Sequence, residues 1–570
     1  MPKSVAIGFE DIKEIIDKDR YYIDKTHMIR DLIDKGGKVN LFVRPRRFGK
    51  TLNLSMIRRF FEQEIDSDGS VISNGYLFDN LDIASCGEKY MAHQGKYPVI
   101  NLSLKSSKQP DYQMAYACLA GEIAKEYRRH AYILSCENLL PSDKKRFLTL
   151  MEQNAAETDY ITALDFLSAC LGIYHKQKVL ILIDEYDVPL ENASLKGFYG
   201  KMTDFIRPLF ESALKTNPYL EFAVITGCLR ISRESIFTGL NNLSVYSILN
   251  SQYADSFGFT QDEVKQLLAS HGRESKFAEV KKWYNGYRFG NQEIYNPWSI
   301  LNYAAAVSEN PDSAPYPYWS NTSSNSIIKE LVERADFNAK QEIEHLISGG
   351  MIQKPVHEDI TYEDIYESQD NLWNFLYFTG YLKAVRESFS GDTTFMDLMI
   401  PNTEVLTIYK RTILAWFDRK MKETDRSSLI KFLETGDTTA FETYVSDQLL
   451  NTISFFDYAE NYYHGFLAGL FKGAGNYLVM SNRECGEGRP DLILKTPSVR
   501  GMAFILEIKT ADAFQKMEQT CQKALQQIEE RNYASGLYAE GYVHIKKYGV
   551  CFYRKECMIK AGNCYEAPKN

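Results

Sequence analysis

A basic loop at residues 44–51, with the sequence RPRRFGKT, contains the residue types that proteins use to bind phosphate. It follows a short apolar run at residues 39–43, typical of a strand, and precedes a segment whose apolar residues recur at helical spacing. In such a loop Gly49 would let the backbone approach a phosphate, Lys50 would contact the β- and γ-phosphates, and Thr51 would bind Mg²⁺. The loop is therefore a candidate Walker A motif for ATP.

The spelling of this loop departs from the strict P-loop pattern, which has glycine where this chain has Arg44. On the loop alone, a basic surface loop before a helix is an alternative interpretation. If the loop binds nucleotide, Arg46, Arg47 and Phe48 complete the stretch that surrounds the phosphates.

Two carboxylates after another apolar run favour the nucleotide site. Residues 179–183 (VLILI) are continuously apolar, which is typical of a strand buried on both faces of a parallel sheet, and Asp184 and Glu185 follow directly. Ligands bind at the carboxyl edge of such a sheet. Asp184 would hold Mg²⁺, directly or through water, and Glu185 would polarise the attacking water, so the pair is a candidate Walker B motif. Together the two motifs predict ATP binding and hydrolysis.

A third apolar run, at residues 222–226, ends at Thr226, where a polar side chain could contact the γ-phosphate. Arg230 or Arg233, a few residues further on, could stabilise the transferred charge. For these three residues the ordinary polarity of a loop is an equally good interpretation.

A second candidate site lies in the C-terminal part of the chain. Asp491 begins the apolar segment DLILK, a turn follows near residues 496–501, and the segment MAFILEIK returns. If this hairpin is centred on Val499, Asp491 lies directly opposite Glu507, and Lys509 shares their face. Two carboxylates that hold Mg²⁺ or Mn²⁺ and a lysine that orients water are what phosphodiester hydrolysis needs. The alternative interpretation is an ordinary strand end without a site, because a Glu-x-Lys sequence also ends many exposed strands.

These sites require an α/β chain with more than one domain. At 570 residues, with 44% hydrophobic and 25% charged residues, the chain exceeds what one hydrophobic core organises. Apolar strands alternate with helices over 1–255, which predicts a P-loop NTPase parallel sheet with flanking helices. The predicted strands of this part are 39–43, 99–104, 179–183 and 222–226, and its predicted helices include 112–130 and 160–175. We expect a mostly helical connecting or lid region at 256–400 and a mixed α/β domain at 401–570, with helices between 408 and 471, a strand pair at 491–509, a helix at 513–531 and strands at 541–554.

The composition of the chain limits the kinds of molecule that it is expected to bind. The formal net charge is −9, so any nucleic acid would have to bind through a local basic patch. The sequence begins without a basic region followed by an apolar stretch, and no run reaches the roughly 18 apolar residues of a membrane helix, so we expect a cytoplasmic protein without membrane contacts. The ten cysteines are scattered without zinc-site spacing and are expected to be reduced and mostly buried. The sequence is compatible with self-association of the protein.

Several blocks, in one order along nearly the whole chain, resemble the AAA-ATPase-like proteins that carry a C-terminal PD-(D/E)XK nuclease domain. They are YYIDKT at 21–26, RPRRFGKT at 44–51, LIDEYD at 182–187, ITGCLRIS at 225–232, WYNGYRFG and YNPWSILNY within 283–303, and YFTGYL at 377–382. The resemblance implies an AAA-like or related STAND-type ATPase and a restriction-endonuclease-like C-terminal domain. In that family an arginine-rich loop without the first glycine is usual, so Arg44 ceases to be a departure.

The resemblance also implies two further residues at the C-terminal site. Glu460 matches the acid on the first helix of the nuclease fold, and Gln527 matches a glutamine on the helix after the Glu-x-Lys strand, where it would join the catalytic set. His464 lies four residues after Glu460 on the same helix face, where packing or substrate positioning is a better interpretation than metal binding. The expected metal ligands are Thr51 and Asp184 at the first site, and Glu460, Asp491 and Glu507 at the second.

Two functions from different classes fit this sequence. In the first, ATP hydrolysis drives or gates a metal-dependent nuclease that acts on DNA or RNA. In the second, the chain is a nucleotide-controlled switch or interaction protein whose C-terminal domain binds a partner or nucleic acid without significant cleavage. The intact set of acids and lysine favours the first, whereas the net acidity and the lack of helicase-type motifs beyond the two Walker elements keep the second open.

Overall fold

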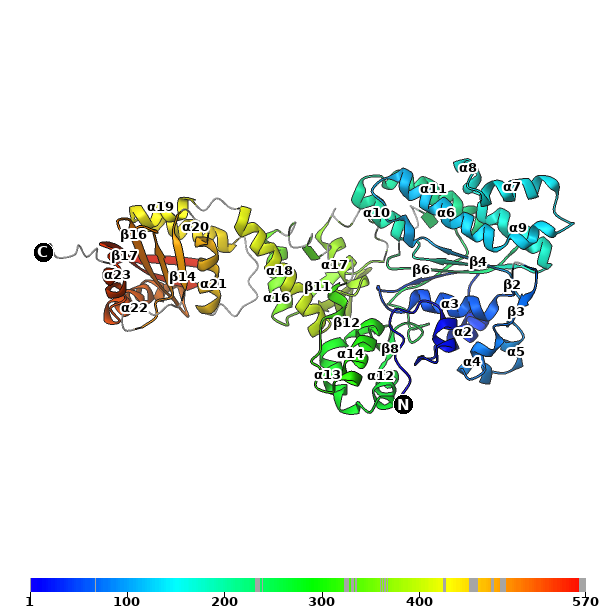
Figure 1. Cartoon of the computed structure of the whole chain (residues 1–570), viewed down its shortest axis with the longest axis horizontal. Helices are drawn as coiled ribbons and strands as arrows, with labels where there is room; N and C mark the ends of the chain where they lie inside the picture. Colours follow the sequence, from blue (N-terminus) through cyan, green and yellow to red (C-terminus); the bar gives the residue numbers. More distant parts are fainter. Residues whose placement is uncertain are drawn as a thin grey trace. The chain divides into compact units, whose positions relative to one another are not determined.

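The structure is a computed structural model of the chain, and its contacts divide into two compact units that are described separately (Figure 1). The first unit is Met1–Thr322 with Met351–Thr407, and the second is Ser323–Gly350 with Ile408–Asn570. The described residues are 2–66, 68–230, 236–237, 239–321, 328–329, 333, 336–358, 360, 362, 365, 368–423, 427–450, 460–472, 476–481 and 488–562. The division into three domains that the sequence predicts stays a prediction.

A five-stranded parallel sheet forms the centre of the first unit, in the order β4-β5-β6-β1-β7. Its strands are β1 (Val39–Val43), β4 (Val99–Ser103), β5 (Val179–Asp184), β6 (Leu220–Gly227) and β7 (Leu243–Tyr246). Every residue of β1 and β5 is buried, as continuous apolar runs predict for strands covered on both faces. Because β6 lies between β1 and β5, its carboxyl end lies between the basic loop and the acidic pair.

Helices cover both faces of this sheet (Figure 1). α3 (Lys50–Phe61) packs against one face, and α6 (Tyr112–Arg129), α9 (Ala163–His175) and α11 (Tyr199–Leu214) pack against the other. The α/β architecture predicted from the alternating pattern is therefore confirmed. The other helices and strands of this part are α1 (Ile12–Asp17), α2 (His27–Lys35), β2 (Glu64–Ile65), β3 (Val71–Ile72), α4 (Asp82–Ser85), α5 (Glu88–Met91), α7 (Pro141–Met151), α8 (Glu157–Tyr160) and α10 (Val188–Lys196).

Residues 256–400 contain helices, as predicted, and also two small sheets that the sequence pattern did not reveal. The helices are α12 (Gln261–Ser270), α13 (Phe277–Tyr284), α14 (Pro297–Glu309), α16 (Phe337–Ile347) and α17 (Gln369–Phe378). One sheet has the order β8-β10-β9, with β8 (Phe259–Thr260), β9 (Tyr287–Phe289) and β10 (Gln292–Tyr295). The other has the order β11-β13-β12, with β11 (Ile352–Pro355), β12 (Lys383–Ser390) and β13 (Thr393–Met399). The strands of two to four residues are too short to show alternation.

A second five-stranded sheet, in the order β14-β15-β16-β17-β18, forms the centre of the second unit. Its strands are β14 (Leu478–Ser481), β15 (Leu492–Lys495), β16 (Met502–Thr510), β17 (His544–Tyr553) and β18 (Glu556–Ala561). β16 and β17 are parallel and the other neighbours are antiparallel. Leu492 pairs with Leu506, which is the register of a hairpin centred on Val499. The predicted register is therefore confirmed.

Helices pack on both faces of this sheet as well. Even-numbered residues of β15 and β16 join a core with α19, α20 and α21, whereas odd-numbered residues such as Ile493 and Ile505 pack with α22 and α23. Asp491, Glu507 and Lys509 are odd-numbered, so the alternation of the strands assigns them to the second face. The helices that pack on this sheet are α19 (Ser427–Thr435), α20 (Thr438–Leu450), α21 (Glu460–Phe471), α22 (Met517–Glu530) and α23 (Ala534–Ala539), and α18 (Thr403–Glu423) precedes them in the chain.

Within the described ranges, no helix combines the length and the apolarity that crossing a membrane requires. The described cysteines are free thiols, and Cys170, Cys228, Cys521, Cys551 and Cys557 are buried. Cys485 and Cys564 lie outside the described residues.

A buried carboxyl group, that of Glu404, lies in the first turn of α18. Both of its oxygens accept hydrogen bonds from the hydroxyl of Ser299, at 2.8 and 2.9 Å, and one accepts the backbone N–H of Trp319 at 2.9 Å. Burial raises the pKa of Glu404 to about 7, against the opposing effect of these hydrogen bonds.

This raised pKa makes the stability of the first unit depend on pH. A carboxyl group with a raised pKa contributes stability that is complete below its unfolded pKa of about 4.3 and is lost as the pH rises through about 7. We expect the free energy of unfolding, measured by urea denaturation, to fall by roughly 2 kcal/mol between about pH 5 and pH 8 because of this group. Glu404→Gln should flatten that slope, and Glu274→Gln at an exposed position should keep it. An unchanged slope in Glu404→Gln would contradict this account.

Candidate active sites

The basic loop leads directly from β1 into α3, and its glycine makes the turn. Gly49 adopts φ 84°, in the left-handed region, and an added Cβ there would meet no atom within 4 Å. The amine of Lys50 donates hydrogen bonds to the carbonyl oxygens of Arg44 at 2.9 Å and Pro45 at 3.0 Å. The loop thus combines an open glycine, a helix N-terminus and an ammonium group, which is the chemistry that binds phosphate.

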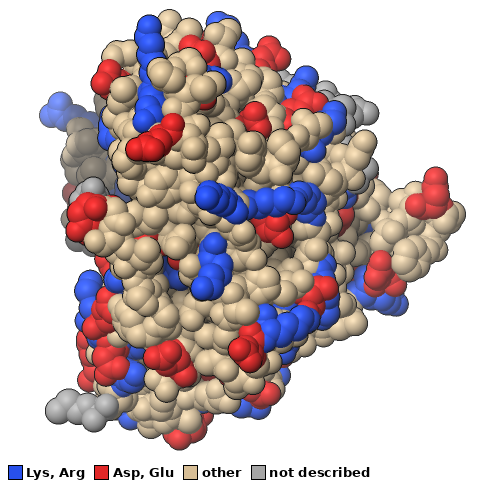
Figure 2. Space-filling view, turned by 90° about the vertical axis from the view of Figure 1, so that its right-hand side faces the viewer, with Lys and Arg blue, Asp and Glu red and all other residues tan. Residues whose placement is uncertain are grey.

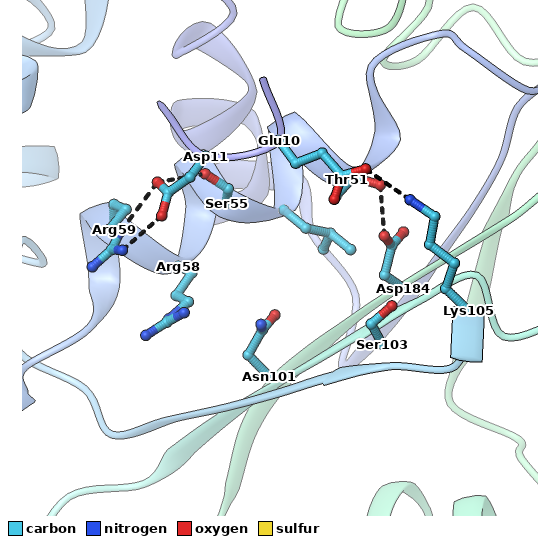
Figure 3. A pocket seen from close by; sticks show the side chains of 11 residues that line it. Glu10, Asp11, Thr51, Ser55, Arg58, Arg59, Asn101, Ser103, Lys105 and Asp184 are labelled. Carbon is cyan, nitrogen blue, oxygen red and sulfur yellow. Dashed lines mark hydrogen bonds and ion pairs between the residues drawn. The ribbon is translucent and has the colours of Figure 1, made fainter. Parts of the chain in front are cut away.

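The Asp184 carboxylate joins α3 to the centre of the sheet. It is 5% exposed, and its two oxygens accept hydrogen bonds from Thr51, at 2.6 Å, and from Thr226. Figure 3 shows the contact between Thr51 and Asp184 at one end of a pocket of about 250 Å³. A hydroxyl and a carboxylate in contact at a helix N-terminus are the ligand pair that proteins use for the Mg²⁺ of a bound nucleotide. The donor set therefore fits Mg-ATP.

Glu185 follows Asp184 in an unfavourable backbone conformation. Its φ is 52°, in the left-handed region that residues with a side chain enter at a cost of roughly 1–2 kcal/mol. Burial raises the pKa of Glu185, the charge of Lys50 opposes this, and the charge of Asp184 adds to it. A carboxylate with a raised pKa beside a candidate metal-binding pair is suited to accept a proton from water.

Arg44 points away from the loop and into the core. Its guanidinium donates hydrogen bonds to the carbonyl oxygens of Val43 at 2.9 Å and Tyr246 at 2.7 Å, and it lies 5.2 Å from the ring centre of Phe257. Burial lowers the pKa of Arg44 to about 9. Arginine at the position of the first glycine therefore anchors the loop to β7 instead of facing phosphate.

The remaining loop residues make different contacts. Arg46 forms an ion pair with Glu191, and the guanidinium of Arg47 lies 4.2 Å from the ring centre of Trp298. The Phe48 side chain is fully buried, so only its backbone could meet a phosphate.

Of the two candidate arginines that follow β6, the structure describes only Arg230. Arg230 forms an ion pair with Glu358 at 2.9 Å. The guanidinium that the sequence predicts to stabilise transferred charge is therefore paired with a carboxylate. Arg233 lies outside the described residues. The role of Arg230 stays a prediction.

Sequence reasoning missed three residues beside this site. Lys105 and Glu10 line the pocket with Thr51 and Asp184 (Figure 3). Asp187 accepts hydrogen bonds from the backbone N–H groups of Cys228 at 2.7 Å and Leu229 at 3.1 Å, which fixes the acidic segment to the end of β6. Only Lys105 carried a sequence signal, because it directly follows the apolar run at 99–104.

The C-terminal hairpin brings the second set of acids together. Asp491 accepts a hydrogen bond from the backbone N–H of Ile508 at 2.8 Å, beside Glu507, and the amine of Lys509 lies 3.7 Å from a Glu507 oxygen. Burial raises the pKa of Glu507 to about 7, the charge of Asp491 adds to this, and the charge of Lys509 opposes it. Two acids and a lysine therefore share one end of the hairpin, as the register predicts.

Gln527 on α22 donates a hydrogen bond to Oε1 of Glu507. The other oxygen, Oε2, is buried and has no hydrogen-bond partner among the described residues. A buried carboxylate oxygen without a donor, beside a second carboxylate, is stabilised by a cation. The site therefore fits Mg²⁺ or Mn²⁺, with Asp491 and Glu507 as ligands.

Glu460 is exposed at the first residue of α21. Partial desolvation of its carboxyl raises its pKa even so, the charge of Lys509 opposes this, and that of Asp491 adds to it. In the part of the chain that the structure describes, no three His, Cys, Asp or Glu side chains group around one point, so Glu460 as a metal ligand stays a prediction. His464 contacts the carbonyl oxygen of Asp491 and the hydroxyl of Ser481, both at 2.9 Å, which is a positioning contact.

Two family models match the chain, and each matched range contains one of the candidate sites. Residues 6–237 match the family model described as a predicted AAA-ATPase, and residues 458–562 match that of the PD-(D/E)XK nuclease superfamily. The chain carries an AAA-ATPase-like domain and a PD-(D/E)XK nuclease superfamily domain. An "uncharacterized protein in vnfD 5′region" of Azotobacter chroococcum mcd 1 is 24% identical over 550 residues, which cover 95% of this chain and 94% of that protein. That similarity extends over both the AAA-ATPase-like and the nuclease-superfamily domains.

The buried position of Arg44 predicts a structural role for it. We expect Arg44→Ala to lower the free energy of unfolding of the first unit by about 3 kcal/mol, because it leaves a cavity and buried carbonyl groups without donors. Urea denaturation measures this, with Arg30→Ala as the control, since Arg30 is half exposed and pairs with its neighbour Asp31. Full stability of Arg44→Ala together with lost nucleotide binding would mean that Arg44 contacts the ligand instead.

Proposed function

We propose that this protein binds and hydrolyses Mg-ATP and that the ATPase cycle controls a metal-dependent phosphodiesterase site that acts on DNA or RNA. The ATPase half is supported by the Asp184 carboxylate, which meets Thr51 from the phosphate loop and Thr226 from β6. The nuclease half is supported by the unpartnered Glu507 oxygen beside Asp491.

At the ATPase site, each residue has a distinct part. Lys50 would leave the carbonyl groups of the loop to bind the β- and γ-phosphates, and Thr51 and Asp184 would hold Mg²⁺. Magnesium would neutralise the phosphate charge. Glu185, with its raised pKa, would orient the attacking water and accept its proton, and Thr226 would sense the γ-phosphate across Asp184.

At the nuclease site, Asp491 and Glu507 would bind Mg²⁺ or Mn²⁺, which lowers the pKa of a bound water and polarises the phosphate. Gln527 would hold Glu507 in place through its amide. Lys509 would orient the attacking water or offset charge on the phosphate, because its amine lies beside the same carboxylate.

Local groups would have to provide the nucleic-acid contact. On the face drawn in Figure 2, Lys and Arg side chains are interspersed with Asp and Glu side chains, and the formal net charge of the chain is −9. The cations at the active sites, and not a general field, would therefore attract the phosphates.

The ATPase assignment predicts different outcomes for two variants. Lys50→Ala should abolish the thermal stabilisation by ATP, because it removes the cation that meets the phosphates. Glu185→Gln should keep ATP binding and slow hydrolysis by about 100-fold or more. Lys196→Ala, on the exposed end of α10, serves as the control for both measurements. Hydrolysis at the wild-type rate by Glu185→Gln would show that another group activates the water.

The nuclease assignment predicts that metal binding and cleavage separate at Lys509. Mg²⁺ or Mn²⁺ should raise the melting temperature of the second unit in the full chain, by an amount that grows with metal concentration. Asp491→Asn and Glu507→Gln should each remove this effect and any cleavage, whereas Lys509→Ala should remove cleavage and spare metal binding. Glu518→Gln is the matched control, because Glu518 is an exposed acid on α22 that pairs with Lys560.

Cleavage is measured with single- and double-stranded DNA and RNA, with Mg²⁺ or Mn²⁺, and with and without ATP. ATP-dependent cleavage that disappears in Asp491→Asn supports the proposal. Metal-dependent binding of nucleic acid without cleavage would instead identify a nucleotide-controlled interaction protein.

A further inference from the structure

Lys105 lies at the carboxyl edge of the parallel sheet, beside the acidic pair. Ser103, near the end of β4, pairs with Asp184 at the end of β5, and the N–H of Leu104 donates to the carbonyl oxygen of Asp184 at 3.0 Å. Lys105 follows directly and lines the same pocket as Asp184. This edge is where parallel sheets bind their ligands, so the amine of Lys105 lies where a phosphate chain would lie.

A carboxylate from the N-terminal segment pairs with this amine. Oε1 of Glu10 lies 2.7 Å from Nζ of Lys105. In Figure 3, Glu10 lies beside Thr51, and Lys105 reaches toward it from the side of Asp184. The hydrogen bond to Glu10 raises the pKa of Lys105, and the charges of Glu185 and Asp184 add to this. Lys105 is therefore a charged ammonium group among the carboxylates of the ATPase site.

The position of Glu10 is fixed by the residue that follows it. Asp11 caps α1 by accepting the backbone N–H of Lys13, and it forms an ion pair with Arg59 of α3 at 2.6 Å. The hydroxyl of Ser55, also on α3, donates to Asp11 at 3.1 Å. The N-terminal segment is thus attached to the helix that carries the phosphate loop, and this attachment holds Glu10 at the pocket.

The pair between Glu10 and Lys105 is weak enough to exchange. The two side chains are 62% and 55% exposed, and exposed ion pairs typically contribute less than about 1 kcal/mol. A triphosphate carries several negative charges, so it attracts an ammonium group more strongly than one carboxylate does. The same charges repel Glu10.

We propose that Lys105 binds the γ-phosphate of ATP and that Glu10 competes with this phosphate for the Lys105 amine. The inference rests on the proposed ATPase function and adds a second phosphate-binding lysine to it. Glu10 then weakens the binding of ATP, whose γ-phosphate must displace Glu10 from the Lys105 amine. The pair affects ADP less, because ADP has no γ-phosphate.

The opposite effects of two substitutions test this inference. In the full chain with Mg²⁺, Glu10→Gln should tighten the binding of a non-hydrolysable ATP analogue by about 3- to 10-fold, and Lys105→Met should weaken it by a similar factor. Both effects should be smaller for ADP and should shrink as salt is added. In the double variant, the Glu10→Gln effect should be smaller than in the wild-type background, because the two residues are coupled.

Asp34→Asn is the matched control, because Asp34 forms a similar exposed ion pair with Lys89 and should leave nucleotide affinity unchanged. If Lys50→Ala abolishes binding while Glu10→Gln and Lys105→Met both keep wild-type affinities for ATP analogue and ADP, the pair is only a surface ion pair, and the proposed ATPase function stands without it. If the wild-type chain shows no binding that depends on Lys50, the proposed function and this inference both fail. Both substituted side chains are more than half exposed, so a folding defect does not obscure the result.

Discussion

The hydrogen bonds of the Asp184 carboxylate are the interaction on which the geometry of the AAA-ATPase-like domain depends. It is buried at the end of β5, and both of its oxygens are satisfied by hydroxyl groups, one from α3 and one from β6. A buried charge without such partners would be strongly destabilising. The three elements are therefore held in one arrangement, in which the phosphate loop at the start of α3 faces the carboxylate that would hold the metal.

At the C-terminal site the carboxylates are less completely supplied with hydrogen-bond donors. Asp491 is fixed by the backbone N–H of Ile508, whereas Glu507 receives a donor at only one of its two oxygens. Burial raises the pKa of Glu507, and the charge of Asp491 adds to this. A divalent cation would lower this cost of burial by neutralising two carboxylates at once. The first site is thus kept in shape by hydroxyl groups, and the second would gain most from a bound metal ion.

The parts of the fold that sequence predicts best are those whose local signal is long or paired. Continuous apolar runs identify β1, β4, β5 and β6, and the hairpin symmetry around Val499 gives the register that places Asp491 with Glu507. Edge strand β7 and the short strands of β8 to β11 lack such signals, because a few residues show no period.

Sequence patterns also do not predict contacts between segments that are far apart in the chain. The Arg44 side chain looks like part of a phosphate loop until its partners on β7 are known. Glu10 and Lys105 are 95 positions apart, and no local pattern indicates that they meet. Likewise, an ion pair with Glu358 makes Arg230 part of a contact that its position after β6 does not suggest.

A net acidic chain can still select phosphates, because each candidate phosphate-binding lysine lies beside a carboxylate. The charges of Lys50 and Glu185 act on each other, Lys105 pairs with Glu10, and Lys509 lies near Glu507. A free phosphate that approaches any of these lysines is repelled by the neighbouring acid, which limits non-specific binding. A phosphate that arrives with Mg²⁺ would have part of its charge neutralised, so the neighbouring acid would repel it less. The acids beside the lysines would therefore favour metal-bound phosphates over free ones at both candidate sites.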